Sequence, residues 1–235
     1  MQHTLLIVTV VSGSLLWLLE GIFPFFRHPT SRISHALPNL GVAALNTALS
    51  AFLMTGTLWG LLHIQPYWRG VRVWQDTEWI TVLLVICYDF WMYCWHWLNH
   101  RLPFLWHFHR FHHSDAEMDI TTGIRFHPAE ITLSEFARFP FLALLGFTAT
   151  DLLLYNLLSL PIILLHHSNL ALPDWLDRQL ALIIPSPNMH RQHHCVEKVE
   201  ADTNYGSLLS LWDRLFGSLR YPDCPRALRL GVLEN

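Results

Sequence analysis

The sequence predicts an all-α, polytopic membrane protein: a bundle of three to four spanning helices with a helical cap at one end that carries histidine clusters. Three observations support this class. Of the 235 residues, 52% are hydrophobic and 14% are charged, a more apolar balance than that of ordinary soluble domains. Four apolar stretches approach or exceed the roughly 20 residues that a helix needs to cross a bilayer. Histidines cluster at or after the ends of the third and fourth stretches.

The first three apolar stretches are each about one span long. Residues 4–26 form the first, and Glu20 interrupts it near its end. We expect a retained helix rather than a signal peptide, because the preceding Met1-Gln2-His3 holds no Lys or Arg and no small-residue cleavage pattern is evident. Residues 41–63 and 79–98 each match the thickness of a bilayer core, so both should span it.

The fourth apolar stretch, residues 136–165, is longer than one span requires. It is punctuated by Pro140, Gly146, Asp151 and Pro161. It fits either one tilted helix or a helical hairpin that returns to the same face. The histidines on its two sides must reach one site, so we favour the hairpin.

Eight histidines fall into three clusters with helical spacing. Residues three and four apart on a helix are surface neighbours, so each cluster aims several rings at a common point. One ion takes about four ligands, and eight therefore suit two neighbouring ions. Imidazoles accept zinc, copper, iron or nickel, and the spacing does not choose among them. The clusters are His96/His100, His109/His112/His113 and His190/His193/His194.

The isolated histidines outside the clusters are interpreted differently. A lone histidine in an apolar helix is more often a hydrogen-bonded core residue than a ligand, and we assign that role to His3, His28, His35, His63 and His107. The eight clustered rings differ, because burying so many polar groups near a membrane without a shared partner would be costly.

Further motifs accompany the clusters in a fixed order: Arg125-Phe126-His127-Pro128-x-Glu130, His167-Ser168-Asn169, Pro187 three residues before His190, Asn204-Tyr205-Gly206, and Leu211-Trp212-Asp213-Arg214-Leu215-Phe216-Gly217. In order and spacing, residues 80–220 resemble the fatty acid hydroxylase and sterol desaturase superfamily of integral-membrane di-iron oxygenases. The resemblance implies a centre of two iron ions that activates O2 to hydroxylate or desaturate a C–H bond of a lipid, acyl chain or sterol-like substrate. Zinc can take the place of iron in purified protein.

The resemblance also implies roles for particular residues. The eight clustered histidines would be metal ligands, and His127 and His167 would be further ligands or groups that contact ligands. Where some family members have two spaced histidines, this chain has adjacent His166 and His167. Adjacent residues point about 100° apart on a helix, so we expect only one of them, His167, to reach the metal.

Other residues are expected around the ligands. Neutral imidazoles leave the charge of the ions uncompensated, so acidic side chains such as Glu117, Asp119, Glu130 and Asp213 are candidates to balance it. Asn204 is a further candidate to lie around the ligands, although its Asn-Tyr-Gly segment is also typical of a turn. Trp212-Asp213-Arg214 fits equally well as a motif that docks a tail helix. We assign no catalytic side chain beyond the ligands.

The partners follow from what the sequence lacks. It has no Gly-x-Gly-x-x-Gly after a strand pattern, no iron–sulfur cysteine set and no c-type haem motif. A separate electron donor, namely a reductase, ferredoxin or cytochrome, is therefore expected beside the lipid substrate. The net charge of -3 without a Lys/Arg block argues against nucleic acid. The oligomeric state is left open.

The predicted organisation is one membrane domain over residues 1–235. Spanning helices and loops occupy 1–78, the hydroxylase-like catalytic region 79–220 and a tail 221–235. Apart from Arg27, Arg32, Arg69 and Arg72, every Lys and Arg lies within residues 100–138 or after residue 167. By the positive-inside rule, the histidine clusters are expected on the cytoplasmic face.

Two other classes fit part of the pattern. A membrane zinc hydrolase also uses histidines, but it more typically has three protein ligands and a catalytic carboxylate, as in His-Glu-x-x-His, which is absent here. A b-type haem electron carrier needs only two axial histidines on facing helices.

Overall fold

The computed structural model describes residues 2–73 and 77–233, and the regular elements in these ranges are helices. Two isolated β-bridges, Pro24 with Leu170 and Cys195 with Leu230, are its strand-like pairings within those ranges. Residues 1, 74–76 and 234–235 belong to the predicted N-terminal region and tail, and they lie outside the described part.

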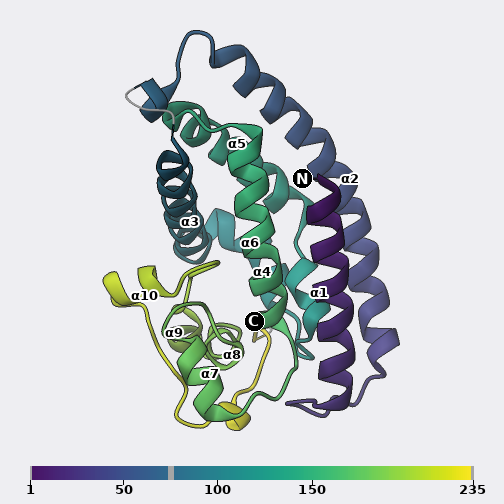
Figure 1. Ribbon diagram of the computed structural model, residues 1–235. Coiled ribbons are helices and arrows are strands. Elements are labelled where there is room, and N and C mark those ends of the chain that lie inside the picture. The colour runs from purple at the N-terminus through teal and green to yellow at the C-terminus, as the bar shows by residue number, and fades with distance from the viewer. Residues whose placement is uncertain (1, 74–76, 234–235) are drawn as a thin grey trace.

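The long helices form the bundle of Figure 1. They are α1 (Gln2–Ile22), α2 (Arg32–Ile64), α3 (Glu78–Arg101), α5 (Pro128–Leu145) and α6 (Ala149–His167). Of these, α1 and α2 extend to the bottom of the view in Figure 1. Four helices in the described residues are long and apolar enough to cross a bilayer, namely His3–Ile22 and the whole of α2, α3 and α6. This confirms the predicted number of spans.

The fourth apolar stretch is a hairpin, as predicted. Helix α5 ends at Gly146, whose φ of 79° places it in the left-handed region that glycine tolerates best. A side chain there would also collide with the backbone carbonyl of Arg69. Thr148 then starts α6 through a capping box with Asp151. Pro140 and Pro161 lie inside the two helices and do not end them.

Short helices form the cap at one end of the bundle. They are α4 (Pro103–His113), α7 (Asp174–Leu180), α8 (Pro187–His193), α9 (Lys198–Ala201) and α10 (Leu211–Leu215), together with the 3-10 turns η2 (Ile120–Ile124) and η3 (Pro225–Ala227). In Figure 1, helices α7 to α10 lie at the lower left, below α3 and beside the lower ends of α1 and α2. The turn η1 (Gly70–Val73) lies at the other end, between α2 and α3.

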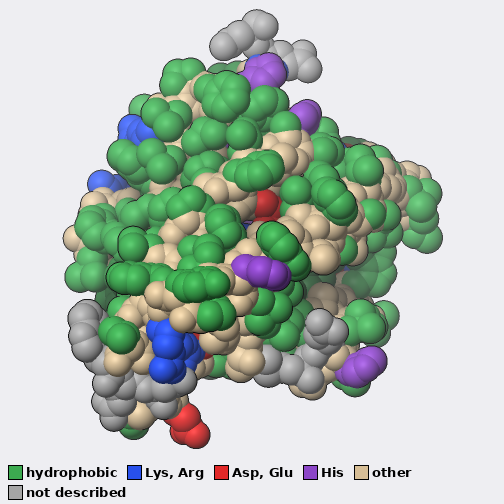
Figure 2. Space-filling view, turned by 90° about the horizontal axis from the view of Figure 1, so that it is seen from above, with side chains coloured by type: hydrophobic (Ala, Val, Ile, Leu, Met, Phe, Trp, Pro, Cys, Tyr) green, Lys and Arg blue, Asp and Glu red, His purple; other side chains and the backbone are tan. Residues whose placement is uncertain are grey.

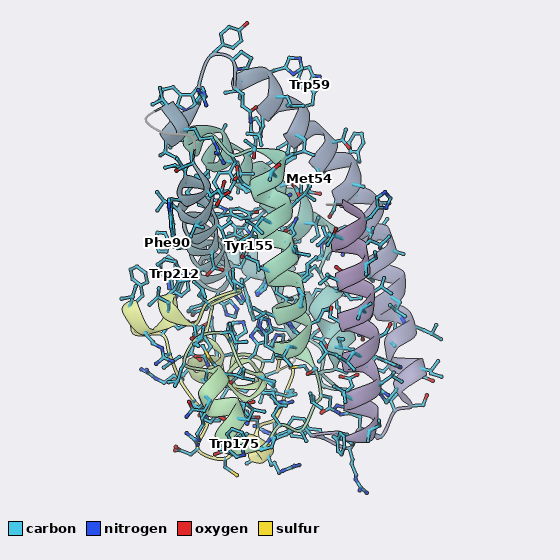
Figure 3. The ribbon with its side chains drawn as sticks, viewed as in Figure 1. Met54, Trp59, Phe90, Tyr155, Trp175 and Trp212 are labelled. Carbon is cyan, nitrogen blue, oxygen red and sulfur yellow. The ribbon has the colours of Figure 1, made fainter. Side chains whose placement is uncertain are left out.

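The surface of the bundle suits a lipid environment. Seen from the end away from the cap, it is covered mainly by hydrophobic side chains with few charges (Figure 2). Along α2, large apolar side chains such as Phe52 (76% exposed) and Trp59 (63% exposed) face outward. Trp59 and Trp175 mark the two ends of the molecule in Figure 3. Aromatic residues at such positions are common at membrane interfaces.

Buried polar contacts fasten the cap to the first two helices. The Glu20 carboxylate, at the end of α1, accepts hydrogen bonds from Arg32 and from the backbone N–H groups of Ile120 and Asn169. His35 of α2 lies between Asp115 and Asp119, with one ring nitrogen 2.9 Å and the other 3.0 Å from a carboxylate oxygen. His35 therefore has the hydrogen-bonded structural role predicted for it.

Candidate metal centre

Two helix ends and two short helices bring the histidines together. His96 and His100 lie on the last turns of α3, and His167 ends α6. Pro103 starts α4, as the sequence predicts, and this helix buries His109, His112 and His113 on one face. Ser186 caps α8, which carries His190 and His193 into the same region. The structure thus places residues from distant parts of the chain at the junction of bundle and cap.

The imidazoles form two groups whose ligand atoms lie within 4.8 Å of one another. The five-histidine group holds His96, His100, His109, His113 and His193. The four-histidine group holds His112, His167, His190 and His194. The His96/His100 cluster therefore stays whole, whereas each of the other two predicted clusters is divided between the groups. Adjacent residues such as His112 and His113 belong to different groups because their side chains point about 100° apart around the helix.

Nitrogen atoms face one another within each group. The Nε2 atoms of His96 and His193 are 2.9 Å apart, and those of His109 and His113 are 3.2 Å apart. In the other group, the Nε2 of His167 lies 3.1 Å from that of His112 and 2.9 Å from that of His190. Two nitrogens bound at a right angle, each about 2.1 Å from one ion, would be about 3.0 Å apart. The separations fit shared coordination.

The other ring nitrogens strengthen this interpretation. The Nδ1 atoms of His96 and His193 contact the backbone carbonyls of Tyr205 (2.9 Å) and Thr203 (2.6 Å). A carbonyl accepts hydrogen bonds only, so each Nδ1 must carry the proton, and a neutral ring then presents a lone pair at Nε2. Two lone pairs facing each other at 2.9 Å repel unless a cation lies between them.

The four-histidine group repeats this arrangement. The Nδ1 atoms of His112 and His167 contact the carbonyls of Arg125 (3.1 Å) and Ile163 (2.7 Å). Their Nε2 atoms therefore also face each other as lone pairs. Both nitrogens of His194 are buried and have no hydrogen-bond partner among the described residues. The donor set of each group therefore fits a metal ion.

Burial keeps these rings in the form that binds a metal. It lowers the pKa of His193 to about 3. It also lowers the pKa of His112, His113, His190 and His194 well below the ordinary value, with further lowering by neighbouring histidines. A neutral imidazole is the state that donates a lone pair to a metal.

Acidic and backbone groups hold the rings of the five-histidine group in place. Glu130 Oε1 lies 2.8 Å from His109 Nδ1, and Asp202 Oδ1 lies 3.2 Å from His100 Nδ1. Asp202 belongs to the same four-residue segment as the carbonyls of Thr203 and Tyr205, so residues 202–205 orient three rings of this group. Such partners fix the ring orientation and raise the basicity of the ligand.

The residues predicted to surround the ligands lie at different distances from the histidine rings. Glu130 contacts the ring of His109 directly. The Asp213 carboxylate accepts hydrogen bonds from the N–H groups of Tyr205 (2.7 Å) and Gly206 (2.9 Å), so it holds the segment that holds His96. Asn204 hydrogen-bonds the backbone of Met189 and Arg220. Glu117 and Asp119, considered in the sequence for the same role, instead contact Thr30 and His35.

Nine of the ten histidines predicted as ligands or their neighbours lie in the two groups, and His127 does not. Its Nδ1 accepts a hydrogen bond from the N–H of Ala129, and the residue caps α5 just before Pro128. His166 also lies outside the groups, while its neighbour His167 lies inside, as the helical angle between them predicts. The His166 ring packs on His190 with centroids 4.0 Å apart.

The sequence did not reveal several groups that shape the centre. Backbone carbonyls such as those of Arg125 and Ile163 carry no residue signature. Asp89 is fully buried on α3 and accepts hydrogen bonds from Trp212 Nε1 and the N–H groups of Leu208 and Leu209. An acidic residue within a spanning segment is a signal that could have identified it.

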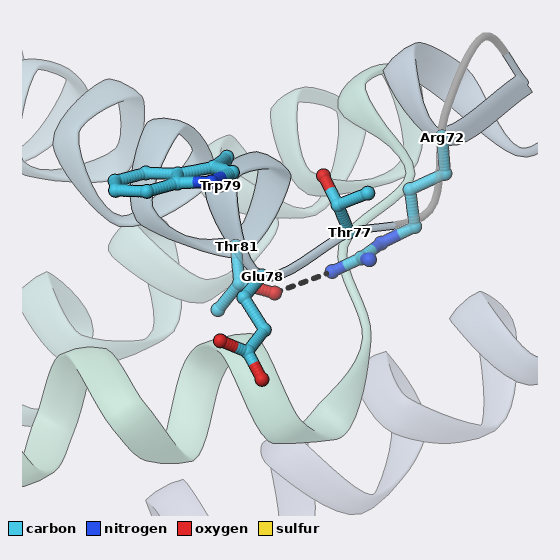
Figure 4. Close-up of a pocket in the computed structure, with 5 residues that line it drawn as sticks. All are labelled: Arg72, Thr77, Glu78, Trp79 and Thr81. Carbon is cyan, nitrogen blue, oxygen red and sulfur yellow. Dashed lines mark hydrogen bonds between the residues drawn. The ribbon is translucent and has the colours of Figure 1, made fainter.

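A cavity of about 290 Å³ adjoins both histidine groups. His96 and His109 line it from one group, and His112, His167 and His190 from the other. A second hollow, shown in Figure 4, lies at the far end of α3, where Arg72 donates a hydrogen bond to Thr81. That hollow contains no histidine, so the cavity beside the two groups is the candidate active site.

These features define a class: a helical membrane protein whose inner helix ends and cap form a paired histidine centre. The chain belongs to the fatty acid hydroxylase family, which it matches over residues 81–218. This confirms the resemblance seen in the sequence. No solved structure matches the chain significantly.

Its relatives include several lipid-modifying enzymes. Ornithine lipid hydroxylase OlsE of Rhizobium tropici is 32% identical over 206 residues, which cover 85% of this chain and 60% of the relative. Alkylglycerol monooxygenase of Homo sapiens is 26% identical over 214 residues, or 86% of this chain and 43% of the relative. A cholesterol 25-hydroxylase-like protein of Danio rerio is 26% identical, covering 74% and 71%. The chain thus spans about three fifths of the first relative and under half of the second.

Proposed function

We propose that this chain is a membrane-bound di-iron oxygenase that uses O2 and external electrons to oxidise a C–H bond of a lipid. The observation that carries the proposal is the set of facing Nε2 lone pairs in two adjoining histidine groups. An unactivated C–H bond offers no handle to acid–base catalysis, and two bound iron ions would supply the oxidising chemistry with O2.

The residues of the chain have defined tasks in this proposal. The five-histidine and four-histidine groups would each hold one ion, and the carbonyl and carboxylate partners of Nδ1 keep the lone pairs aimed inward. The cavity would bring a segment of the lipid to the rings of both groups. Its walls include Met92, Trp95 and Phe126, apolar side chains that favour a hydrocarbon chain over water.

Hydroxylation is the favoured outcome. The relatives reported above are named as hydroxylases or monooxygenases, which insert one oxygen atom, and these names support hydroxylation over desaturation. They also support a lipid or sterol-like substrate. The electrons would come from a separate reductase, ferredoxin or cytochrome, and the distribution of Lys and Arg supports a cytoplasmic position of the centre.

Lipid analysis tests the proposal. Cells with and without the chain would be grown under isotopically labelled O2, and their lipid extracts compared by mass spectrometry. We expect a lipid that gains one labelled oxygen atom. His109→Ala should abolish the product, whereas His107→Ala, an exposed histidine on the same helix, should not. A product that lacks two hydrogens would instead indicate desaturation.

The two alternative classes give different results. A zinc hydrolase would retain zinc and release lipid fragments without any requirement for O2. A b-type haem protein would show a Soret band after purification.

A further inference from the structure

A buried ion pair lines the same cavity as the histidines. Glu135 and Arg138 lie one turn apart on α5, and the Arg138 Nε donates a hydrogen bond to Glu135 Oε2 at 3.0 Å. A second guanidinium nitrogen pairs with the other carboxylate oxygen. The two side chains are 9% and 13% exposed. The ion pair is therefore bidentate and almost removed from solvent.

The ion pair lies within the bundle, away from the cap. Arg138 Nη1 donates to the hydroxyl of Tyr88 at 3.1 Å, and Nη2 lies 3.8 Å from the sulfur of Met54. Tyr88 precedes His96 by eight residues of α3, or about 12 Å of helix. In Figure 3, Met54 lies on the bundle well above the cap. The cavity thus has a metal-binding end and an ion-pair end.

Charges at this depth are costly, and an ionisable side chain inside a membrane protein usually marks a function. Tyr88 and Arg138 connect α3 to α5, but a neutral polar side chain that hydrogen-bonds the phenol would do this without burying two charges. The position of both charged side chains in the cavity wall calls for a second explanation.

The ion pair can recognise a particular kind of group. Arg138 has five N–H donors. Two are directed at Glu135, one at Tyr88 and one at the sulfur of Met54, so one N–H of Nη1 remains for a ligand, while the carboxylate keeps spare lone pairs. The two charges compensate each other, so a charged ligand would gain no net attraction and would lose its hydration. A neutral group that both donates and accepts hydrogen bonds, such as a hydroxyl or an amide, suits the pair.

We propose that Glu135 and Arg138 bind a neutral hydroxyl or amide group of the lipid substrate and so fix which carbon reaches the histidines. This inference rests on the proposed function, because it treats the cavity as a lipid site. Nearby Ser134 and Ser50 also line the cavity and add hydroxyl groups to the same polar region. The cavity is large enough for part of a hydrocarbon chain rather than a whole lipid. Binding of the polar group by the ion pair would therefore determine which carbon lies beside the histidines.

Direct binding tests the proposal without turnover. The metal-loaded full chain in lipid nanodiscs would be titrated anaerobically with tritium-labelled dodecane, 1-dodecanol, dodecanamide and dodecanoate, with binding to empty nanodiscs subtracted. We expect the alcohol or the amide to bind at least tenfold more tightly than dodecane and dodecanoate, and the stronger of the two identifies the group. Equal binding of all four probes, or tightest binding of dodecanoate, would overturn the proposal.

Variants separate recognition from structural support. The double variant Glu135→Leu/Arg138→Met removes both charges together, and the preference for a polar probe should fall to within twofold of dodecane. Arg178→Met removes an exposed pair with Asp174 and should retain the preference. Persistence of the preference in the double variant would overturn the proposal.

A conservative variant covers the case in which the double variant fails to fold. Glu135→Gln keeps the shape but leaves the Arg138 charge uncompensated, so dodecanoate should then bind at least tenfold more tightly than in the unmodified chain. A purely structural ion pair would leave the order of probes unchanged, and that result would overturn the proposal. Because the assay uses no O2 or electrons, its result is independent of whether the lipid is oxidised.

Discussion

The ring of His113 stacks on the ring of His194, with centroids 4.3 Å apart and planes 14° from parallel. His113 belongs to the five-histidine group and His194 to the four-histidine group. The contact therefore joins the two groups directly, and two ions bound there would be neighbours. The same contact joins α4 to the segment after α8. A displacement of the rings in one group should therefore also displace rings in the other.

Glu130 is expected to tune the five-histidine group through His109. Glu130→Gln would keep the shape but weaken the acceptor of the His109 Nδ1 proton, and loss of such a partner typically lowers metal affinity about 10- to 100-fold. We expect this loss in a competition titration with a metal chelator. Glu197→Gln, which alters an exposed pair with Arg229, is the control and should leave the affinity unchanged. Equal affinities of the two variants would count against the role of Glu130.

Asp213 should matter for stability and for the metal together. Asp213→Ala leaves the buried N–H groups of Tyr205 and Gly206 without their acceptor, at about 1–3 kcal/mol for each group. The segment that positions His96 would loosen. We predict a lower thermal transition and a metal content reduced mainly in the five-histidine group, measured on the same sample. Full retention of both would refute the assignment.

Gly123 leaves room for the ring of His167. A Cβ at this position would lie 3.2 Å from the Cγ and Nδ1 atoms of that ring, closer than ordinary contact. Gly123→Ala should therefore displace His167 and weaken metal binding by the four-histidine group several-fold. Gly41→Ala is a matched control, because a Cβ there meets nothing within 4 Å. Metal titration of both variants checks the prediction, and identical binding would disprove it.

Acid should destabilise the metal-free protein. The pKa of His193 is about 3 in the folded protein, against roughly 6.5 in an unfolded chain. Between these values the unfolded state binds more protons, so stability present above about pH 6.5 is lost as the pH falls, by up to about 1.4 kcal/mol per pH unit for each such histidine. Thermal denaturation of chelator-treated protein between pH 8 and pH 5 should show this decline. A flat profile would show that the rings are not buried as described.

The sequence predicted the helices well where one local signal dominated. Pro103 started α4, and Gly146 separated α5 from α6, because proline and glycine restrict or free the backbone wherever they occur. Spacing on a helix also predicted that the rings of His109, His112 and His113 would share a face. Their division between two groups depended on residues from α3, α6 and α8, which no local pattern contains.

Other parts of the site could not be predicted because they depend on tertiary contacts. The His127 motif resembled a ligand segment, but a residue before proline readily takes the extended conformation that caps a helix. Glu135 and Arg138 carry no distinctive sequence signal, since a Glu and an Arg three residues apart are common on helix surfaces. Only the packing of α5 against α3 places them in the cavity. The segment from Asp202 to Tyr205 acts largely through backbone carbonyls, which any sequence would provide.

Metal analysis of protein grown on iron-57 would show whether the two histidine groups hold a pair of iron ions. Elemental analysis combined with Mössbauer spectroscopy counts the iron ions per chain and shows whether they interact. We expect two iron ions per chain in neighbouring sites with nitrogen-rich coordination, and loss of both in a His113→Ala/His194→Ala variant. A single isolated ion, or a haem spectrum, in fully loaded protein would be incompatible with a paired iron centre.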